Sequence, residues 1–164
     1  MPFLQRKNMR LKEYDYSQDG YYFVTICTQD RRYLFTELNG IGKMADYWWN
    51  ELPNHFKNEI DLDEYVFMPN HIHGILIRKN VGADRCVRPI KLGDVIQWFK
   101  TMTTNEYIKK IKSENWPKFD KRIWQRDYYE RIIRDEREYF KIKNYIKINP
   151  ERWGRDRNNL TNAK

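Results

Sequence analysis

The sequence predicts an α+β fold with the element order βαββαβ and one further helix at its C-terminal end. Short segments rich in aromatic and β-branched residues alternate with longer segments whose apolar residues recur at helical spacing. Turn residues lie between these segments. The 164 residues, 40% of them hydrophobic, are enough for a single domain over residues 1–164 with a substantial core.

The first half of the chain predicts a strand, a helix and then a hairpin. Tyr21–Thr28 follows a turn signal and predicts a buried strand, and the helix after it is expected to end before Pro53. Two further strands, Leu62–Met68 and His71–Arg78, are joined by a two-residue turn that fits an antiparallel hairpin. The apolar residues that predict the helix are Met44, Tyr47, Trp48 and Leu52.

The second half predicts a helix, a strand and a last helix. Leu92–Lys112 has an apolar stripe, and Ile123–Ile133 predicts a fourth strand whose charges indicate an edge or a bend. The last helix is expected over residues 135–149, because Asp135 can cap it and Pro150 disfavours helical geometry in the residue before it. This order gives a four-stranded antiparallel sheet beneath two helices, as in ferredoxin-like folds.

Composition excludes several classes of protein. No apolar run approaches the roughly 20 residues that cross a bilayer, so we expect a cytoplasmic protein with no membrane partner. Cys27 and Cys86 form no CxxC pair and are expected to be free thiols.

The charge is distributed unevenly along the chain. Residues 1–99 hold 13 basic and 13 acidic residues, whereas residues 100–164 hold 18 basic and 10 acidic residues. This asymmetry predicts a nucleic-acid partner, and a solvated basic surface is the alternative.

Two of the three histidines flank a single residue in the strand segment His71–Arg78. Because strand side chains alternate, His71 and His73 are expected on one face, roughly 7 Å apart, with Ile72 directed into the core. Gly74 would let the backbone of a ligand approach the sheet. Two imidazoles on one face can share a divalent cation, although a surface histidine that binds nothing is the alternative. A structural zinc site would need Cys27, Cys86 or His55 as further ligands.

A tyrosine on a helix with an oxygen or amide ligand four residues later could act as a nucleophile beside a metal, because positions i and i+4 share a face. Tyr47 with Glu51 fits this spacing, and its surroundings predict core packing. Tyr145 with Asn149 fits it on a helix that is rich in lysine, so Tyr145 is the better candidate. Membership of an ordinary apolar stripe is the alternative for Tyr145.

Three segments resemble the REP-associated tyrosine transposases, a bacterial branch of the single-tyrosine HUH transposases. They are YDYSQDGYYFVTICT (14–28), FMPNHIHGI (67–75) and WQRDYYERIIRDEREYFKIKNYIKINPERW (124–153). The resemblance implies that His71 and His73 form the HUH motif, that Tyr145 is catalytic and that Asn149 is a third metal contact. It also implies Mg²⁺ or Mn²⁺ as cofactor, since imidazole ligands alone would equally suit zinc or nickel.

The activity implied by the resemblance is that of a metal-dependent transposase and endonuclease for single-stranded DNA. It would cleave and rejoin hairpins formed by REP-like palindromes, through a covalent 5′-phosphotyrosine intermediate. The resemblance leaves the oligomeric state open, because this branch is often expected to act as a monomer, whereas related insertion-sequence transposases act as homodimers that exchange tyrosine helices. A non-catalytic binding module for single-stranded nucleic acid is the alternative function, although the RNP pattern of RNA-binding domains is absent from the sequence.

The basic residues supply candidate DNA contacts. A basic arm over residues 1–18 could bind DNA or serve as a solubilising tail. One aromatic residue, Trp124, or else Tyr128 or Tyr129, could stack on an unpaired base, with core packing as the alternative. The candidate phosphate contacts are Arg6, Lys7, Arg10 and Lys12 in the arm, and Lys100, Arg126, Arg131, Arg134, Lys141 and Lys147 beyond it.

Overall fold

A computed structural model describes residues 15–35, 40–57, 59–79 and 89–162. Its strands are β1 (Gly20–Cys27), β2 (Ile60–Met68), β3 (His71–Arg78) and β4 (Tyr129–Ile133). Its α-helices are α1 (Gly40–Asn50), α2 (Leu52–His55), α3 (Leu92–Glu114) and α4 (Glu136–Ile148). Three short 3₁₀ helices are η1 (Gln29–Arg31), η2 (Pro150–Arg155) and η3 (Leu160–Asn162). Within the described ranges, no helix is both long and apolar enough to cross a membrane.

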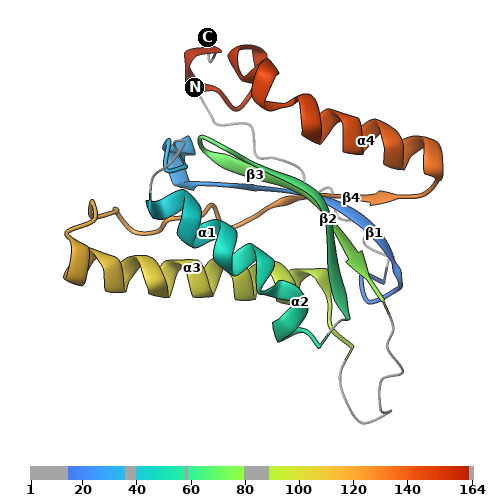
Figure 1. Cartoon of the computed structure of the whole chain (residues 1–164), viewed down its shortest axis with the longest axis horizontal. Coiled ribbons are helices and arrows are strands. Elements are labelled where there is room, and N and C mark those ends of the chain that lie inside the picture. The colour runs from blue at the N-terminus through green and yellow to red at the C-terminus, as the bar shows by residue number, and fades with distance from the viewer. Residues whose placement is uncertain (1–14, 36–39, 58, 80–88, 163–164) are drawn as a thin grey trace.

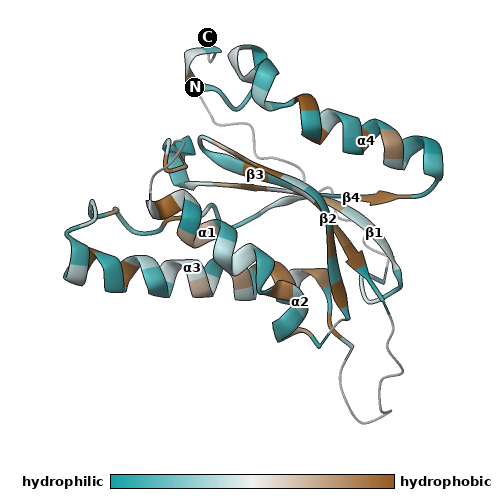
Figure 2. Ribbon diagram, in the orientation of Figure 1, coloured by the Kyte–Doolittle hydropathy of each residue, from teal (hydrophilic) through white to brown (hydrophobic). Residues whose placement is uncertain are grey.

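The four strands form one sheet in the order β2-β3-β1-β4, and every neighbouring pair is antiparallel. This arrangement confirms the predicted fold class. Helices α1 and α3 cover one face of the sheet, and α4 lies over the opposite face (Figure 1). The central strands β1 and β3 are therefore covered on both sides. Figure 2 shows that α3 and α4 are largely hydrophilic with a few hydrophobic residues, as expected for helices with one buried face.

The two faces of the sheet pack very differently. The face under α1 and α3 holds an extensive core around Trp49, Phe99 and Ile72. On the α4 face the buried apolar cluster consists of four residues, Phe23, Ile75, Ile133 and Ile146. Less apolar surface is therefore available to hold α4, and polar side chains occupy the rest of that interface.

Several element boundaries differ from those predicted. The first helical segment starts at Gly40 and divides at Glu51, where α2 begins with Pro53 in its first turn. The predicted fourth strand, Ile123–Ile133, is interrupted. Its C-terminal part forms β4, and its N-terminal part pairs with the residue after β1 through an isolated antiparallel bridge between Trp124 and Thr28. Between the two parts, Lys100 binds the backbone carbonyls of residues 125–127. The capping of α4 is confirmed, since the Asp135 carboxylate accepts a hydrogen bond of 2.7 Å from the backbone N–H of Glu138.

Strand β2 contains a bulge. Leu62 pairs with Leu76, but the next pair joins Tyr65 to Gly74, so two residues of β2 lie opposite one residue of β3. The two residues at the bulge are both acidic, Asp63 and Glu64. The extra residue shifts the alternation of β2, so that Tyr65 packs into the α1 side of the sheet.

Gly74 makes room for a core side chain, and the expectation that it admits the backbone of a ligand was wrong. A Cβ at this position would lie 2.6 Å from Cζ2 of Trp49 on α1. Its neighbour in sequence, His73, points to the other face, so Gly74 faces the helices.

We therefore expect Gly74→Ala to lower the free energy of unfolding by about 1–3 kcal/mol, because the buried indole of Trp49 has to shift. Urea denaturation measures this loss. Gly154→Ala is the matched control, since no atom lies within 4 Å of the added Cβ, and its effect is expected to stay within about 0.5 kcal/mol. Equal effects of the two substitutions would contradict this account.

Candidate metal and tyrosine site

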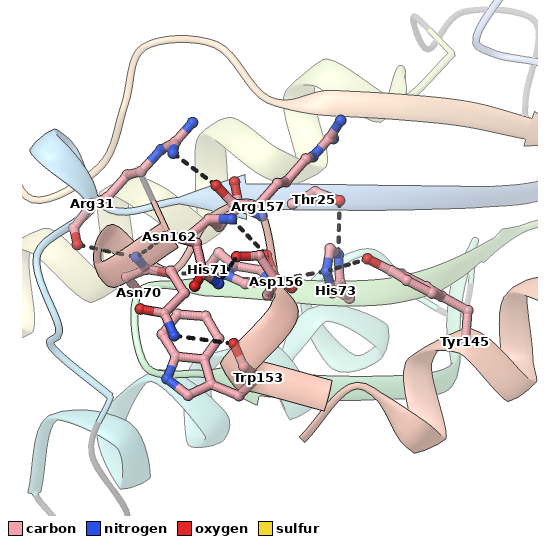
Figure 3. Close-up of polar contacts among 12 residues, drawn as sticks. Thr25, Arg31, Asn70, His71, His73, Tyr145, Trp153, Asp156, Arg157 and Asn162 are labelled. Carbon is pink, nitrogen blue, oxygen red and sulfur yellow. Dashed lines mark hydrogen bonds and ion pairs between the residues drawn. The ribbon is translucent and has the colours of Figure 1, made fainter. Parts of the chain in front are cut away.

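The two histidines of β3 meet on the α4 face of the sheet, as their alternation predicts (Figure 3). Both are buried, and their Nε2 atoms are 3.0 Å apart. Ile72 between them points into the opposite core. The rings lie nearly perpendicular, with centroids 4.4 Å apart. The strand thus presents two ring nitrogens to one point.

Hydrogen bonds at the far side of each ring set its orientation. His71 Nδ1 lies 2.8 Å from Oδ1 of Asn70. The amide nitrogen of Asn70 donates to the backbone oxygens of Arg31 and Asn158, which leaves Oδ1 as the acceptor for His71. His71 Nδ1 is therefore the protonated nitrogen, and Nε2 of the neutral ring has a free electron pair. His73 Nδ1 lies 2.8 Å from the hydroxyl of Thr25, which can donate or accept. Without a cation, the 3.0 Å contact with His71 Nε2 favours a proton on His73 Nε2, whereas a bound cation would take the place of that proton.

Both rings are neutral at pH 7. Burial lowers the pKa of His71 to about 4; the charge of Asp156 opposes this shift, and those of Arg31 and Arg157 add to it. Burial also lowers the pKa of His73 to about 2, with smaller contributions from His71 and Arg157. The neutral imidazole is the form that binds a metal ion.

Tyr145 of α4 lies beside the histidine pair. Its hydroxyl oxygen is 3.3 Å from Nε2 of His73, and its ring meets Phe23 edge-on. The side chain is 42% exposed, so the hydroxyl lies between the buried site and solvent. Tyr47, the other tyrosine with the i+4 spacing, is 58% exposed, which shows that its predicted core packing was wrong.

Asn149 follows α4, and its side chain is hydrogen-bonded to the phenol of Tyr145. Burial raises the pKa of the Tyr145 phenol, and a hydrogen bond from the Asn149 side chain opposes this shift. Asn149 is itself buried, and its Oδ1 has no hydrogen-bond partner among the described residues. A buried acceptor oxygen of this kind costs free energy unless a donor or a cation satisfies it.

Asp156 is a carboxylate that the sequence analysis missed. Its Oδ2 lies 3.8 Å from Nε2 of His71, while the other oxygen accepts a 2.6 Å hydrogen bond from the backbone of Asn158. One ligand atom each from His71, His73 and Asp156 lie within 4.8 Å of one another. One feature of the sequence could have pointed to Asp156: Glu151 and Asp156 are the only acidic residues in the basic segment after residue 148.

The donor set fits a divalent cation. An ion bound at about 2.1 Å by two nitrogens at a right angle would separate them by about 3 Å, which matches the spacing of the histidines. Two imidazoles with a nearby carboxylate oxygen of Asp156 suit a first-row divalent ion that keeps open positions. No fourth zinc ligand joins the pair among the described residues. His55 is stacked on Trp98 of α3, and Cys27 is not part of the cluster formed by His71, His73 and Asp156. Cys86 lies outside the described residues.

Some of the predicted DNA contacts have structural roles. Trp124 is 4% exposed in the larger core, and its indole N–H donates to Thr103, so in this structure it is not available to stack on a base. The ammonium of Lys100 binds the carbonyls of residues 125–127 and lies over the Tyr128 ring. Lys147 lies 3.5 Å from Glu64 of β2.

Other predicted contacts are grouped around a groove between β4 and the start of α4. The groove has a volume of about 650 Å³, and its lining includes Arg131, Arg134, Lys141 and Tyr129. Arg131 forms an ion pair with Glu138 there. Arg126 is exposed on the segment before β4. The basic arm residues Arg6, Lys7, Arg10 and Lys12 lie outside the described residues.

A ferredoxin-like sheet that presents a histidine pair to a tyrosine on a separate helix is the arrangement expected of a single-tyrosine HUH protein. No protein-family model matches the chain. An uncharacterized protein of Haemophilus influenzae is 34% identical over 165 residues, covering 92% of this chain and 91% of that protein. A putative REP-associated tyrosine transposase of the same organism is 27% identical over 150 residues, covering 85% and 75%.

The fold also matches a solved structure, that of a REP-associated tyrosine transposase bound to a REP hairpin. The TM-score is 0.61 at 20% sequence identity, and the match covers 89% of this chain and 75% of the other. With the motifs in the sequence, these comparisons show that the chain is similar to REP-associated tyrosine transposases in sequence and in fold.

The buried histidines predict a pH-dependent stability of the metal-free protein. The unfolded chain takes up protons on its histidines as the pH falls below about 6.5, whereas folded His71 does so only near 4. The unfolding free energy is therefore expected to fall between pH 7 and pH 5, by up to ~1.4 kcal/mol per pH unit for each ring. Urea denaturation in EDTA measures this change. His73→Gln should make the dependence shallower, and an unfolding free energy that is the same at both pH values would refute buried neutral rings.

Proposed function

We propose that this protein cleaves and rejoins single-stranded, hairpin-forming DNA, with Tyr145 as the nucleophile and a divalent ion held by His71 and His73. The observation that carries the proposal is the short distance, 3.3 Å, between the Tyr145 hydroxyl and the His73 nitrogen that faces His71. A phosphate bound at the histidine pair would lie within reach of this oxygen. The similarity to REP-associated tyrosine transposases supports the same assignment.

The proposed reaction is a transesterification at phosphorus. The Tyr145 oxygen attacks the scissile phosphorus, the bond from phosphorus to the 3′ oxygen breaks, and the phenolic proton ends on the released 3′-OH. The DNA is then joined to the protein through its 5′ phosphate. The new bond is again a phosphodiester, so a 3′-OH can reverse the step and rejoin the DNA. Mg²⁺ or Mn²⁺, when bound, would polarise the phosphate oxygens.

The surroundings of Tyr145 control its proton. Because burial raises its pKa above 10, the phenol is neutral at pH 7 and has to lose its proton as it attacks. The Asn149 side chain opposes this effect by favouring the phenolate. Phe23 supports the ring from one side.

The DNA partner would meet the protein along the groove and the basic arm. Arg131, Arg134 and Lys141 supply cations for phosphates, and Tyr129 offers a ring for an unpaired base. The hairpin in the related solved structure supports a folded single strand as the substrate. The arm residues Arg6, Lys7, Arg10 and Lys12, together with Arg126, would add affinity that depends on salt.

The nucleophile is tested by the substitution Tyr145→Phe. With Mn²⁺ and a hairpin with single-stranded flanks, we expect the wild-type protein to form a denaturant-resistant adduct, and the variant to lose it by at least ~10³-fold. The variant should still bind the hairpin, because only the attacking oxygen is removed. Denaturing gel electrophoresis detects the adduct.

Tyr47→Phe is the matched control, since it removes another exposed helical tyrosine with an acceptor at i+4. Its adduct yield should equal that of the wild type. Tight, salt-sensitive binding with no adduct under any metal condition would instead favour a non-catalytic binding module.

The metal ligands are tested by titration calorimetry with Mn²⁺. His71→Ala is expected to abolish measurable binding. Asp156→Asn should weaken it by about 10–100-fold, because it removes the carboxylate beside the histidines, and Asn149→Ala should do the same if its unpartnered buried oxygen binds the ion. Glu151→Gln, an exposed acidic residue in the same segment, is the matched control and should leave the affinity unchanged. An Asp156→Asn variant with wild-type affinity would exclude Asp156 as a ligand.

A further inference from the structure

The acidic bulge of β2 faces three side chains of α4 that lie one helical turn apart. These side chains are Tyr139, Lys143 and Lys147, and the spacing of four residues places them in one row along the helix. The row lies on the helix that also bears Tyr145. Lys143 and Lys147 belong to the basic C-terminal part of the chain, which the sequence analysis associated with DNA.

The bulge brings two consecutive carboxylates to this row. In an uninterrupted strand, Glu64 would share a face with Leu62, beneath α1. Because the register shifts after Leu62, Tyr65 takes the place on the α1 side, and Val66 packs into the small cluster under α4. Asp63 and Glu64 are both left to face the helix. Bulges commonly redirect side chains in this way beside functional sites.

The contacts between bulge and helix are polar and partly enclosed. Lys143 Nζ lies 2.6 Å from one oxygen of Asp63 and 3.0 Å from the Tyr139 oxygen, and the Tyr139 hydroxyl donates to the other oxygen of Asp63. Lys143 and Asp63 are 27% and 16% exposed. Lys147 pairs with Glu64 at 3.5 Å. Burial raises the pKa of Asp63, but the hydrogen bonds from Lys143 and Tyr139 outweigh it and lower the pKa overall.

The apolar contribution to the same interface is small. Among the described residues, four buried side chains form the cluster between the sheet and α4, and α4 supplies one of them, Ile146; Tyr139 and Ile142 of α4 pack against it while partly exposed. Apolar contacts are not directional, whereas a carboxylate held by two donors fixes both the distance and the rotation of the helix. Lys143 is two residues from Tyr145, so its position also sets that of the nucleophile.

We propose that Asp63, with Glu64, is a positioning residue that holds α4 against the sheet of its own chain, with the Tyr145 hydroxyl at the histidine pair. One chain then contains the histidines, the nucleophile and the device that aligns them. The effect on activity rests on the function proposed above. The effect of Asp63 on the position of α4 is independent of that function, because it concerns the fold alone.

Amide hydrogen exchange tests the effect on the helix. Asp63→Ala is expected to increase exchange over residues 136–148 by at least about 10-fold, while exchange over α3 stays unchanged. Asp61→Ala is the matched control, because Asp61 belongs to the same strand but pairs with Lys79, not with α4. Asp63→Glu, which keeps the charge, should restore much of the protection. The exchanged pair Asp63→Lys with Lys143→Asp should do the same.

Single-turnover adduct formation tests the effect on Tyr145. Asp63→Ala should slow the adduct step about 10-fold or more with unchanged hairpin affinity, and Asp63→Glu should recover it. The proposal is overturned if Asp63→Ala matches Asp61→Ala in helix exchange, or if α3 loses protection as much as α4. If the wild-type protein forms no adduct, the proposed function fails, while the exchange experiment still decides the role of Asp63.

Discussion

The alternation of side chains along β3 is the constraint on which the rest of this structure depends. β3 is a central strand with both faces covered, so each of its residues is committed to one of two environments. His71 and His73 enter the α4 face, whereas Ile72 and Gly74 enter the core beneath α1. A slip of one residue would bury both imidazoles among tryptophans and move Ile72 to the polar site. The large core thus fixes the register that places the site.

Burying two imidazoles is costly, and the surrounding polar groups compensate. Asn70 and Thr25 bind the far nitrogens, so the Nε2 atoms are turned toward each other and toward Tyr145. The same face has little apolar surface, and α4 is anchored largely by hydrogen bonds and ion pairs. The apolar core therefore lies on one face of the sheet, and the polar candidate site lies on the other.

Local patterns predicted much of the site. The spacing of His71, His73 and Tyr145, together with the cap at Asp135, depends on strand and helix periods that the sequence displays directly. Residues brought together only by tertiary packing were not predictable: Asp156 reaches the histidines after a 3₁₀ turn, and Trp49 fills the space at Gly74 from a distant helix. The bulge at Asp63 has no sequence signature, and it pairs Glu64 with Lys147, which was an expected DNA contact. Trp124 was wrongly expected to stack on a base, because the sequence alone does not distinguish a tryptophan buried in the core from one that contacts DNA.

The central claim is that one chain assembles a divalent-ion site at the histidine pair with its own tyrosine beside it. Anomalous diffraction from crystals soaked in Mn²⁺ tests this most directly. The account predicts a single strong peak at coordination distance, about 2.0–2.3 Å, from Nε2 of both His71 and His73. Their Nδ1 atoms should remain on Asn70 and Thr25, and Tyr145 of the same chain should lie alongside. A peak elsewhere, or a Tyr145 supplied by a second copy of the chain, would contradict it.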